Sequence, residues 1–477
     1  MNDSLERYRD LLDTAEFEQL LQAVLRPLPS AIRINILKIA VGDARRAWPA
    51  WYGWQVQPVS FCGAGWQVTG EAIAKTLEHK MGFYYVQDAA SMLPVEMFDF
   101  ERNGPLVLDM AAAPGGKTTH LVSRMGDRGL VVANDANNRR IPPLRAKLQD
   151  WGAVNVAIAN YPGEQFESWF PETFDKVLLD APCSGESLRT AERRRMQPVS
   201  ANERQALYQR QVELLCSAFR ALKPGGEVVY ATCSLAPEED EMVLDALLNL
   251  YPHQATIEAV DHVLLAPAPA LASAGERVFH PQVSHAVRLW PHLYDTSGFF
   301  AAKIGKLDSV DVRPADPPGR SLESIGFVRM GQREMADVCD HLLQVYGFDF
   351  EAVIERQALV LWEHKRSVYA IPELFLASFA NLPCVATGMH IGDQGEGGFE
   401  PSHALVARFS ERFSERRLVL ADDHVGVWLG GRDLRGVQTT YALGEVILLE
   451  DQKSRFLGLG KVLSKRVRNL LPRRLIY

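Results

Sequence analysis

The middle of the chain, residues 104–304, alternates short runs of β-branched apolar residues with longer stretches of helical periodicity. A strand that is followed by a helix and a second strand forms a βαβ unit, in which the two strands are parallel. Five runs predict such strands: PLVLDM, GLVVAND, NVAIAN, DKVLLDAP and GGEVVYATCS. The pattern therefore predicts an α/β fold with a Rossmann-like, doubly wound sheet.

The chain has 477 residues, which is too long for one hydrophobic core, so we expect further domains around a central domain at 81–305. Residues 1–80 begin with an amphipathic helical pattern and predict a small α+β module. The proline-rich stretch 306–321 predicts a linker. Residues 322–380 predict a mixed α/β connecting region. Residues 381–477 predict a β-rich barrel or sandwich, from the runs ALVARF, RLVLAD, VGVWLGG and YALGEVILLE.

Several classes of protein are excluded by composition. No run of about 18 apolar residues is present, so no membrane span is expected. The N-terminus carries acids and lacks the basic start of a signal peptide, which favours a cytoplasmic protein with reduced thiols. The six cysteines form no CxxC pair, so we expect neither a disulfide framework nor a metal site. They are Cys62, Cys183, Cys216, Cys233, Cys339 and Cys384.

The formal net charge of -8 argues against a nucleic-acid partner, but binding follows the local field and not the average. Two basic patches stand out, although a run of charge more often marks only a solvated face. One contains Arg189, Arg193, Arg194 and Arg195. The other, residues 461–477, has no acid and contains Lys461, Lys465, Arg466, Arg468, Arg473 and Arg474. Both patches are compatible with binding of structured RNA.

A turn of small residues predicts a cofactor site. In LVLDMAAAPGGKTTHL an apolar strand ends at Asp109, and ligands of open α/β sheets bind at this end of the strands. The turn lacks the GxGxxG fingerprint, and alanine stands at 111 where a phosphate-binding loop needs glycine. These absences argue against NAD and ATP. The turn consists of Ala111, Ala112, Ala113, Pro114, Gly115, Gly116 and Lys117.

The next predicted strand, GLVVAND, ends at Asp135. An acid in this position is well placed to bind both ribose hydroxyls of a nucleoside. Together with a turn that has no phosphate cradle, it favours S-adenosylmethionine as the cofactor. An ordinary turn with a capping aspartate is the structural alternative.

Two cysteines follow later strands of the sheet. Cys183 lies in APCSG directly after a strand that ends at Asp180, and Cys233 ends GGEVVYATCS. A single free cysteine is usually a small buried apolar residue. Two thiols and a carboxyl group at one edge of the sheet indicate chemistry instead, and we expect these side chains to lie close together.

The chemistry that needs a thiol is methylation at carbon 5 of a pyrimidine. This carbon is a poor nucleophile, and a thiolate that adds to carbon 6 of cytosine turns the ring into an enamine. Nitrogen 3 gains a proton during the addition, and Asp180 could hold or supply it. A base then removes the carbon 5 proton and the thiol leaves. Spacing does not decide whether Cys183 or Cys233 attacks.

These residues resemble the Sun-type RNA cytosine-C5 methyltransferases, and among them the bacterial RsmF-type enzymes that act on small-subunit rRNA. The resemblance covers most of the chain. It includes SAIRINILK, YYVQDAASMLP, AAAPGGKTTHL, LLDAPCSGES, LKPGGEVVYATCS, TSGFFAAKI and GLGKVLSKRVRNLLPRRL. The pairing of PCSG with TCS on one Rossmann-like domain is highly specific.

The resemblance implies a role for each site residue. Cys233 is implied to be the nucleophile, Cys183 to assist product release, and Asp180 to contact the cytosine beside the cofactor. The 111–117 turn and Asp135 are implied to bind the cofactor. Arg140 matches an arginine of the family pattern with a structural or RNA-facing role.

The chain departs from the family pattern in two places. Ala111 stands where the family turn often opens with cysteine. Pro162 stands where an acid usually contacts the adenine. We expect Asn160, or a backbone group, to supply that contact.

The resemblance also implies the partners. It predicts a monomer that acts on structured RNA, 16S rRNA or the small ribosomal subunit, with no metal and no membrane. The flanking modules would bind the RNA, and the C-terminal one is expected to be similar to a PUA domain. Three alternatives remain: a tRNA cytosine-C5 methyltransferase, a non-catalytic RNA-binding assembly factor, and a methyltransferase acting on small molecules or proteins.

Overall fold

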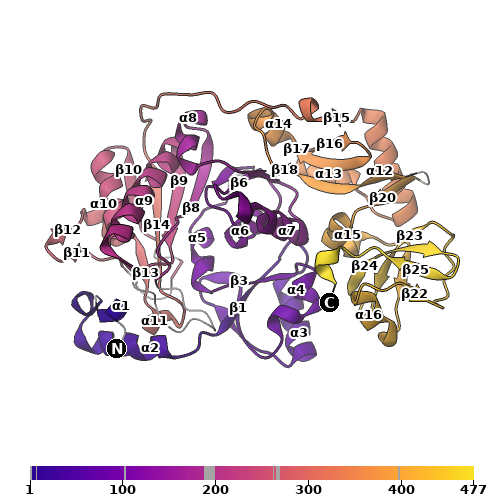
Figure 1. Cartoon of the computed structure of the whole chain (residues 1–477), viewed down its shortest axis with the longest axis horizontal. Helices are drawn as coiled ribbons and strands as arrows, with labels where there is room; N and C mark the ends of the chain where they lie inside the picture. Colours follow the sequence, from indigo (N-terminus) through magenta and orange to yellow (C-terminus); the bar gives the residue numbers. More distant parts are fainter. Residues whose placement is uncertain are drawn as a thin grey trace.

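The five predicted parallel strands lie at the centre of a nine-stranded sheet in the computed structural model (Figure 1). The structure describes residues 3–6, 8–100, 104–186, 199–260, 263–264, 269–395 and 398–476, so the basic patch at Arg189, Arg193, Arg194 and Arg195 lies outside the described residues. The strands are β5 (Leu106–Asp109), β6 (Leu130–Asn134), β7 (Val156–Ala159), β8 (Phe174–Asp180) and β9 (Leu222–Thr232). The Rossmann-like α/β prediction is confirmed.

The order of these strands is β9-β8-β5-β6-β7, and β5 pairs in parallel with both β6 and β8. The chain therefore starts at β5, builds the sheet outward on one side and then returns to build the other. Open α/β sheets bind their ligands where the strand order reverses in this way, outside the carboxyl ends of the strands.

Antiparallel strands extend both sides of the sheet. β14 (Phe299–Lys306) pairs with β9, while β10 (Ala255–Glu258) and β13 (Val287–Leu289) pair with β14. At the opposite edge, β18 (Ala386–Thr387) pairs with β7 and joins the C-terminal part of the chain to the central sheet. β11 (Ser273–Ala274) and β12 (Arg277–Val278) form a separate hairpin.

Helices cover both faces of the sheet, which explains why its strands are apolar throughout rather than alternating. α6 (Gly116–Met125) and α7 (Ile141–Trp151) pack on the face that carries Val107 and Val131. α9 (Ala201–Ala221) and α10 (Glu241–Leu250) pack on the opposite face. α8 (Phe166–Trp169) and α11 (Pro291–Tyr294) are single turns.

The N-terminal part forms an antiparallel sheet of four strands in the order β2-β3-β1-β4. The predicted N-terminal helix begins only at Thr14, where Asp13 caps it by accepting a hydrogen bond from the Glu16 amide at 2.8 Å. The strands are β1 (Ser30–Ile34), β2 (Gln55–Val59), β3 (Cys62–Thr69) and β4 (Tyr84–Val86). The helices are α1 (Asp3–Glu6), α2 (Thr14–Leu25), α3 (Val41–Tyr52), α4 (Leu77–Lys80) and α5 (Leu93–Glu96).

Two further sheets of five strands lie beyond residue 321. The first runs in the order β15-β16-β17-β19-β20 and spans 327–401, on both sides of the boundary predicted at 380. Its strands are β15 (Phe327–Arg329), β16 (Leu359–His364), β17 (Ser367–Pro372), β19 (Met389–Gly395) and β20 (Gly398–Pro401). Its helices are α12 (Gln332–Tyr346), α13 (Glu351–Gln357) and α14 (Glu373–Phe379). The domain limits themselves stay a prediction.

The last sheet runs in the order β21-β23-β24-β25-β22. Its strands are β21 (Arg417–Val419), β22 (Leu434–Arg435), β23 (Val446–Glu450), β24 (Phe456–Leu463) and β25 (Arg466–Asn469). This sheet packs against the N-terminal module, because Leu77 and Met81 share a hydrophobic cluster with Leu449 and Leu457. Arg455 extends the contact through an ion pair with Glu78 at 3.1 Å.

Two of the predicted C-terminal strands are wrong, because ALVARF and VGVWLGG form helices. The first is α15 (His403–Phe409), where the Ser402 hydroxyl caps the helix by accepting from the Leu405 amide at 3.1 Å. The second is α16 (Asp422–Leu429), whose first turn carries two acids that favour a helix N-terminus. Both runs are short and apolar, and such runs do not distinguish strand from helix by periodicity.

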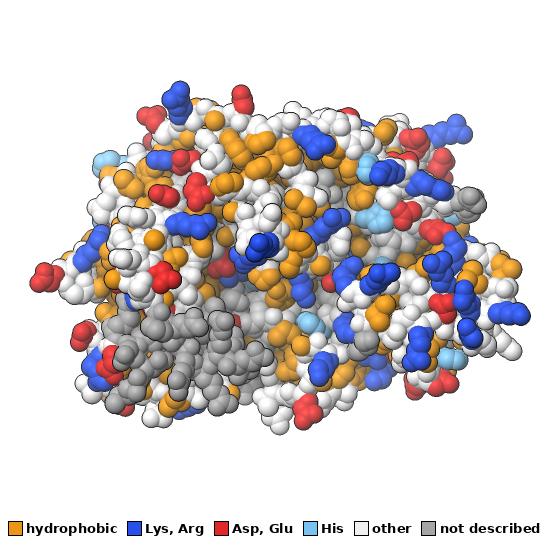
Figure 2. Space-filling view, in the orientation of Figure 1, with side chains coloured by type: hydrophobic (Ala, Val, Ile, Leu, Met, Phe, Trp, Pro, Cys, Tyr) orange, Lys and Arg blue, Asp and Glu red, His pale blue; other side chains and the backbone are white. Residues whose placement is uncertain are grey.

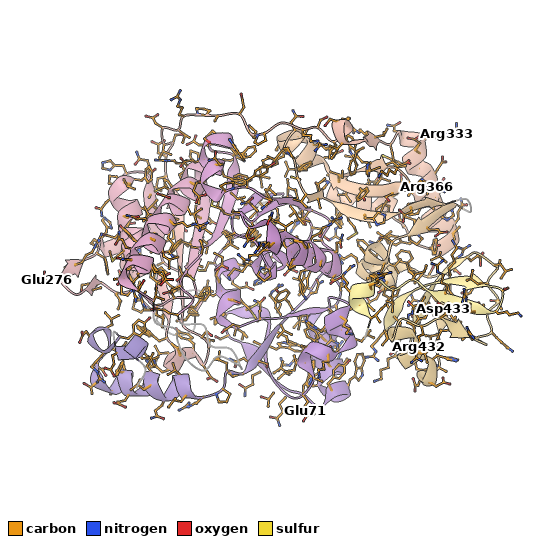
Figure 3. The ribbon with its side chains drawn as sticks, in the orientation of Figure 1. Glu71, Glu276, Arg333, Arg366, Arg432 and Asp433 are labelled. Atoms are coloured by element: carbon orange, nitrogen blue, oxygen red, sulfur yellow. The ribbon has the colours of Figure 1, made fainter. Side chains whose placement is uncertain are left out.

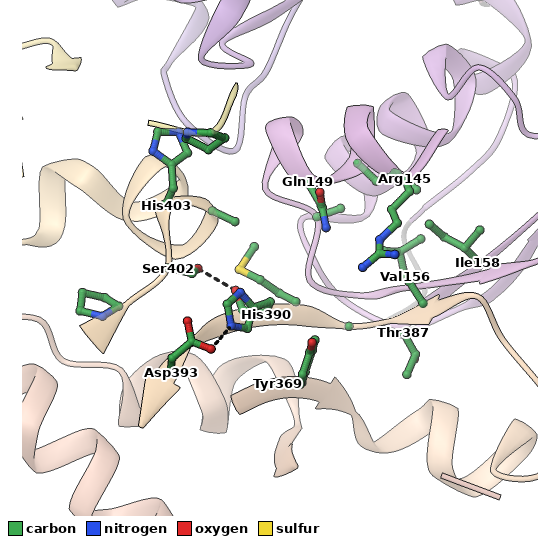
Figure 4. Close-up of a pocket in the computed structure, with 18 of the residues that line it drawn as sticks. Arg145, Gln149, Val156, Ile158, Tyr369, Thr387, His390, Asp393, Ser402 and His403 are labelled. Atoms are coloured by element: carbon green, nitrogen blue, oxygen red, sulfur yellow. Dashed lines mark hydrogen bonds and ion pairs between the residues drawn. The ribbon is translucent and has the colours of Figure 1, made fainter. Parts of the chain in front are cut away.

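A cavity of about 570 Å³ lies where the C-terminal part meets the central domain. Figure 4 shows His390, Ser402 and His403 across from Arg145 and Gln149 of α7. Among the described helices, none has both the length and the hydrophobicity needed to cross a membrane.

Candidate active site

The loops after β8 and β9 bring two thiols together at the carboxyl edge of the sheet. Cys183 Sγ and Cys233 Sγ lie 3.1 Å apart, both side chains are half-buried, and both cysteines are free. The pair forms because β8 and β9 are parallel neighbours that end side by side. The interaction with Cys233, together with burial, raises the pKa of Cys183 well above its ordinary value. Cys183 is thus a thiol that can donate a hydrogen bond to its neighbour.

A lysine and an aspartate lie beside the thiols. Lys117 Nζ donates to Asp180 Oδ2 at 2.7 Å, and the Asp180 side chain remains 33% exposed. Burial opposes the charge of Lys117, but the nearby acids and Cys233 more than offset it and raise the pKa of the lysine. The lysine therefore provides a fixed positive charge close to Cys233.

The predicted turn is closed by hydrogen bonds within the sheet. The Ala112 amide donates to the Asn134 carbonyl at 2.7 Å, and the Thr118 hydroxyl donates to Asp109 Oδ2 at 2.7 Å. Gly115 has a φ of +108°, a region that side chains rarely adopt. The turn therefore needs glycine at this position for backbone reasons alone.

A cavity of about 150 Å³ separates the turn from the segment that follows β4. Gly116 faces this segment, and a side chain there would contact the Tyr85 ring at 3.4 Å. The small residues thus keep the cavity open. Its lining consists of Tyr85, Gln87, Ser91, Asp109, Ala111, Ala112, Ala113, Pro114, Gly116, Lys117 and Asp180.

Orphaned polar atoms show that this region fits a polar cofactor. Both amide atoms of Gln87 and Oδ1 of Asp109 are buried without a hydrogen-bond partner among the described residues. Burial raises the pKa of Asp109 to about 7. Native proteins rarely leave such groups unsatisfied, so a ligand with both donors and acceptors suits the site. The amino and carboxylate groups of S-adenosylmethionine have this character.

The two other predicted cofactor residues lie behind the turn and are bonded within the protein. Asp135 Oδ2 accepts from the Ala113 amide at 3.1 Å and pairs with Arg140 at 3.2 Å, while Oδ1 accepts from the Asn137 amide at 2.9 Å. Asn160 Nδ2 donates to the Asp135 carbonyl at 2.6 Å. Arg140 also donates to the Ala113 carbonyl, so its contacts are structural. Contact of Asp135 with ribose and of Asn160 with adenine stays a prediction.

Three lining residues were not predicted: Tyr85, Gln87 and Ser91. They come from the end of the N-terminal module, which folds over the cofactor turn. The signal was present in the run YYVQDAASMLP, where two polar residues follow a short apolar strand. Their link to the turn is a tertiary contact that no local pattern encodes.

The C-terminal basic patch is partly neutralised. Lys461 pairs with Glu400 at 2.6 Å, Arg466 with Asp433 at 3.2 Å and Arg474 with Asp150 at 2.8 Å. Figure 3 labels Asp433 beside the last sheet. The remaining cations, Lys465, Arg468 and Arg473, are exposed. Figure 2 shows lysine and arginine side chains gathered over this sheet.

One group of potential metal ligands occurs in the described part of the chain. It consists of Cys62, Glu96 and His120, whose ligand atoms lie within 4.8 Å of one another. The group is partly satisfied internally, because His120 Nε2 lies 3.0 Å from Glu96 Oε1, and Arg124 pairs with the other oxygen at 3.4 Å, whereas His120 Nδ1 is buried without a partner among the described residues. The charge of Arg124 would oppose a metal ion, and we assign none.

Comparison with known proteins extends over almost the whole chain. Residues 98–305 match the family model described as 16S rRNA methyltransferase RsmB/F, and residues 2–89 match the N-terminal domain of 16S rRNA methyltransferase RsmF. Two similar proteins, from Klebsiella pneumoniae and Vibrio cholerae, are both named ribosomal RNA small subunit methyltransferase F. Each is 32% identical; the alignments cover 96% and 98% of this chain and 93% and 95% of the relatives.

A solved structure is similar to about two thirds of the chain. A methyltransferase homologue from Pyrococcus horikoshii is 32% identical, with a TM-score of 0.54. The match covers 63% of this chain and 97% of that one.

Proposed function

The chain belongs to the RsmB/F family of 16S rRNA methyltransferases, and from this premise we propose that it methylates carbon 5 of a cytosine in 16S rRNA, through a covalent bond between Cys233 and carbon 6. S-adenosylmethionine is the methyl donor. The observation that carries the proposal is the contact between Cys183 and Cys233, with Sγ atoms 3.1 Å apart beside Lys117 and Asp180. Methyl transfer to an oxygen or an exocyclic amine would need no thiol.

Attack begins with Cys233 as the thiolate, which is the nucleophilic form of a cysteine. The new sulfur–carbon 6 bond places an electron pair on the ring, and nitrogen 3 takes up a proton from solvent, which it loses again when the thiol leaves. Asp180 is bonded to Lys117 and is therefore suited to hold the proton on nitrogen 3 as an acceptor. Its exposed fraction leaves an oxygen accessible to the base.

Carbon 5 of the resulting enamine is nucleophilic. When bound, the cofactor supplies an electrophilic methyl group on sulfur, and the 111–117 turn, Asp109 and Gln87 are the residues that would hold it. Release then requires loss of the carbon 5 proton to a base and cleavage of the bond to Cys233. Cys183 touches the leaving sulfur, and we assign it the role of assisting this step.

The flanking parts of the chain would bind the RNA in the cytoplasm. The target base must leave its stack to reach Cys233, so the protein needs contacts with the surrounding RNA. Exposed cations of the C-terminal sheet would contact phosphates, with an affinity that falls as salt rises. The N-terminal module lies against the turn and would contact the RNA near the target.

Trapping of the covalent intermediate tests the proposal. Cys183→Ala should accumulate a protein–RNA adduct, because attack proceeds while release stalls. Denaturing gel electrophoresis after incubation with cofactor and RNA from cells that lack the protein would show the adduct. The double variant Cys183→Ala/Cys233→Ala should form none. An adduct that survives loss of Cys233 would overturn the assignment of the nucleophile.

The identity of the RNA is tested separately. Bisulfite sequencing of total RNA from cells with and without the protein should show the loss of a 5-methylcytosine in 16S rRNA. If 5-methylcytosine is lost only from tRNA, the substrate is tRNA and not 16S rRNA. If no 5-methylcytosine is lost from any RNA, the proposed methyltransferase activity is wrong.

A further inference from the structure

One buried carboxylate is bonded to both of the loops that carry the thiols. Glu239 lies in the loop after β9 and is fully buried, with 0% of its surface exposed. Its Oε1 accepts hydrogen bonds from the hydroxyls of Ser184 at 2.5 Å and Ser234 at 2.8 Å. Its Oε2 accepts from the Ser184 amide at 2.8 Å and from Gln211 Nε2 at 3.1 Å. Four donors thus converge on one side chain.

The donors are neighbours of the thiols in sequence. Ser184 directly follows Cys183, and Ser234 directly follows Cys233. Gln211 also donates to the carbonyl of Pro182 at 2.9 Å, which lies just before Cys183. We propose that Glu239 is a positioning residue, which holds the two thiol loops in register so that Cys233 and Cys183 meet. This inference rests on the proposed function and adds a residue that does not touch the RNA.

Only a carboxylate satisfies this arrangement. All four contacts are donors, and an ionised carboxylate is a pure acceptor with room for about four hydrogen bonds. The amide of glutamine would turn its two donors either toward the Ser184 amide and Gln211, which are donors themselves, or toward the two serine hydroxyls, which would then lose the acceptor for their own protons. Glu239 takes part in none of the ion pairs among the described residues, so its burial is compensated by hydrogen bonds alone. A buried charge is costly unless its environment is arranged for it.

The backbone of the loop is held from its other side. Tyr230 donates to the Glu239 carbonyl at 2.6 Å, and Thr232 donates to Asp240 Oδ1 at 2.6 Å. Arg288, which is also fully buried, donates to the Leu235 carbonyl at 2.7 Å and pairs with Asp240 at 3.4 Å. The backbone that carries Glu239 is therefore held in place, so that its carboxylate can orient Ser184 and Ser234.

The test uses adduct formation by the full chain. In the Cys183→Ala parent, Glu239→Gln should slow the single-turnover rate of the adduct at least tenfold. The apparent RNA affinity and the cofactor affinity should stay within twofold, because Glu239 contacts neither ligand. A matched control is Glu227→Gln, which removes a half-buried carboxylate in β9, bonded to Lys176 at 2.7 Å and Lys303 at 2.8 Å. This control should form adduct at the parent rate.

Coupling separates positioning from a general loss of packing. Ser234→Ala should slow adduct formation by itself. Adding it to Glu239→Gln should cause little further loss, because both changes break the same contact between residues 239 and 234. Independent, multiplicative losses would overturn the proposal. If Glu239→Gln does not fold, Ser184→Ala and Ser234→Ala still decide: adduct formation by both at the parent rate would also overturn it.

The outcomes keep this inference separate from the proposed function. If the Cys183→Ala parent forms no adduct, the proposed mechanism fails before Glu239 is tested, and the inference falls with it. If the parent forms the adduct and Glu239→Gln forms it equally fast, only the positioning role of Glu239 is wrong.

Discussion

At the carboxyl edge of the central sheet, polar side chains are buried and contact one another, whereas in the C-terminal segment the charged side chains point outward. Glu239 is bonded to both loops that carry the thiols, and Lys117 of α6 is paired with Asp180 at the end of β8. Lys461, Arg466 and Arg474 instead pair separately with acids of three different elements. Reaction chemistry requires fixed geometry, while attraction of RNA requires only a local field. The two regions should therefore respond very differently to substitution.

The largest expected effect is the loss of the proposed nucleophile. Cys233→Ala should lower methyl transfer by at least about 10³-fold, because the proposed mechanism needs this thiol to add to carbon 6 before carbon 5 becomes nucleophilic. Transfer of a radiolabelled methyl group to RNA measures this. Cys384→Ala, another half-buried thiol far along the chain, is the matched control and should keep full activity. Equal rates for Cys233→Ala and Cys384→Ala would show that the thiol at the carboxyl edge of the sheet matters no more for activity than a thiol elsewhere in the chain.

The next effect concerns the fixed cation. Lys117→Met should reduce single-turnover methyl transfer by about 10²-fold, because it removes both the partner of Asp180 and the charge near Cys233. Lys176→Met breaks a comparable ion pair with Glu227 at 2.7 Å on the same sheet. That control should lower the midpoint of thermal unfolding but leave transfer intact. If both variants lose only stability, Lys117 is structural.

A smaller effect is expected at the C-terminal sheet. Deletion of residues 461–477 would remove β25 and part of β24, so point variants are the sharper test. Replacing Lys465, Arg468 and Arg473 by alanine should weaken RNA binding about tenfold. The salt dependence of binding should also flatten, by roughly 0.7–0.9 in slope for each RNA phosphate that the variant no longer neutralises.

The paired cations of the same segment provide the control for this prediction. Lys461→Ala and Arg474→Ala should change RNA affinity and its salt slope less, because their charges are already compensated by acids. Filter binding at several salt concentrations and calorimetric titration of the cofactor distinguish the outcomes. Equal slopes for exposed and paired cations would show that pairing does not matter there.

The smallest effect is a pH dependence at the junction between the regions. Burial, with Lys38 and Arg474 nearby, lowers the pKa of His403 to about 3. Below the ordinary pKa of about 6.5, the unfolded chain binds a proton that the folded chain does not. The contribution of His403 to the free energy of unfolding is therefore fully present above pH 6.5. It falls as the pH drops toward 3, by at most about 1.4 kcal/mol per pH unit.

His403→Gln should remove this contribution. Urea unfolding at pH 7 and pH 5 would measure it as a smaller loss of stability between the two pH values than in the unchanged chain. His390 lies in the same cavity and pairs with Asp393 at 3.2 Å, so His390→Gln is a suitable comparison (Figure 4). An identical pH profile for His403→Gln and the unchanged chain would contradict the prediction.

Local sequence patterns determined the parts of this protein that depend on neighbours along the chain. The five parallel strands, the small-residue turn at 111–117 and the placement of Cys183 and Cys233 after two strands all follow from short-range patterns. Such patterns act through backbone preferences and through the face that each residue buries. They failed for ALVARF and VGVWLGG, where a short apolar run suits both structures; the Ser402 cap favours helix in the first, and two acids in the first turn favour it in the second.

Tertiary structure alone decided which distant groups touch. That β8 and β9 are neighbours brings the Sγ atoms of Cys183 and Cys233 to 3.1 Å, and packing of the N-terminal module adds Gln87 to the cofactor wall. Glu239 likewise accepts hydrogen bonds from Ser184 and Ser234, which lie 55 and 5 positions earlier in the chain. These contacts depend on how whole elements pack, and no local periodicity carries that information.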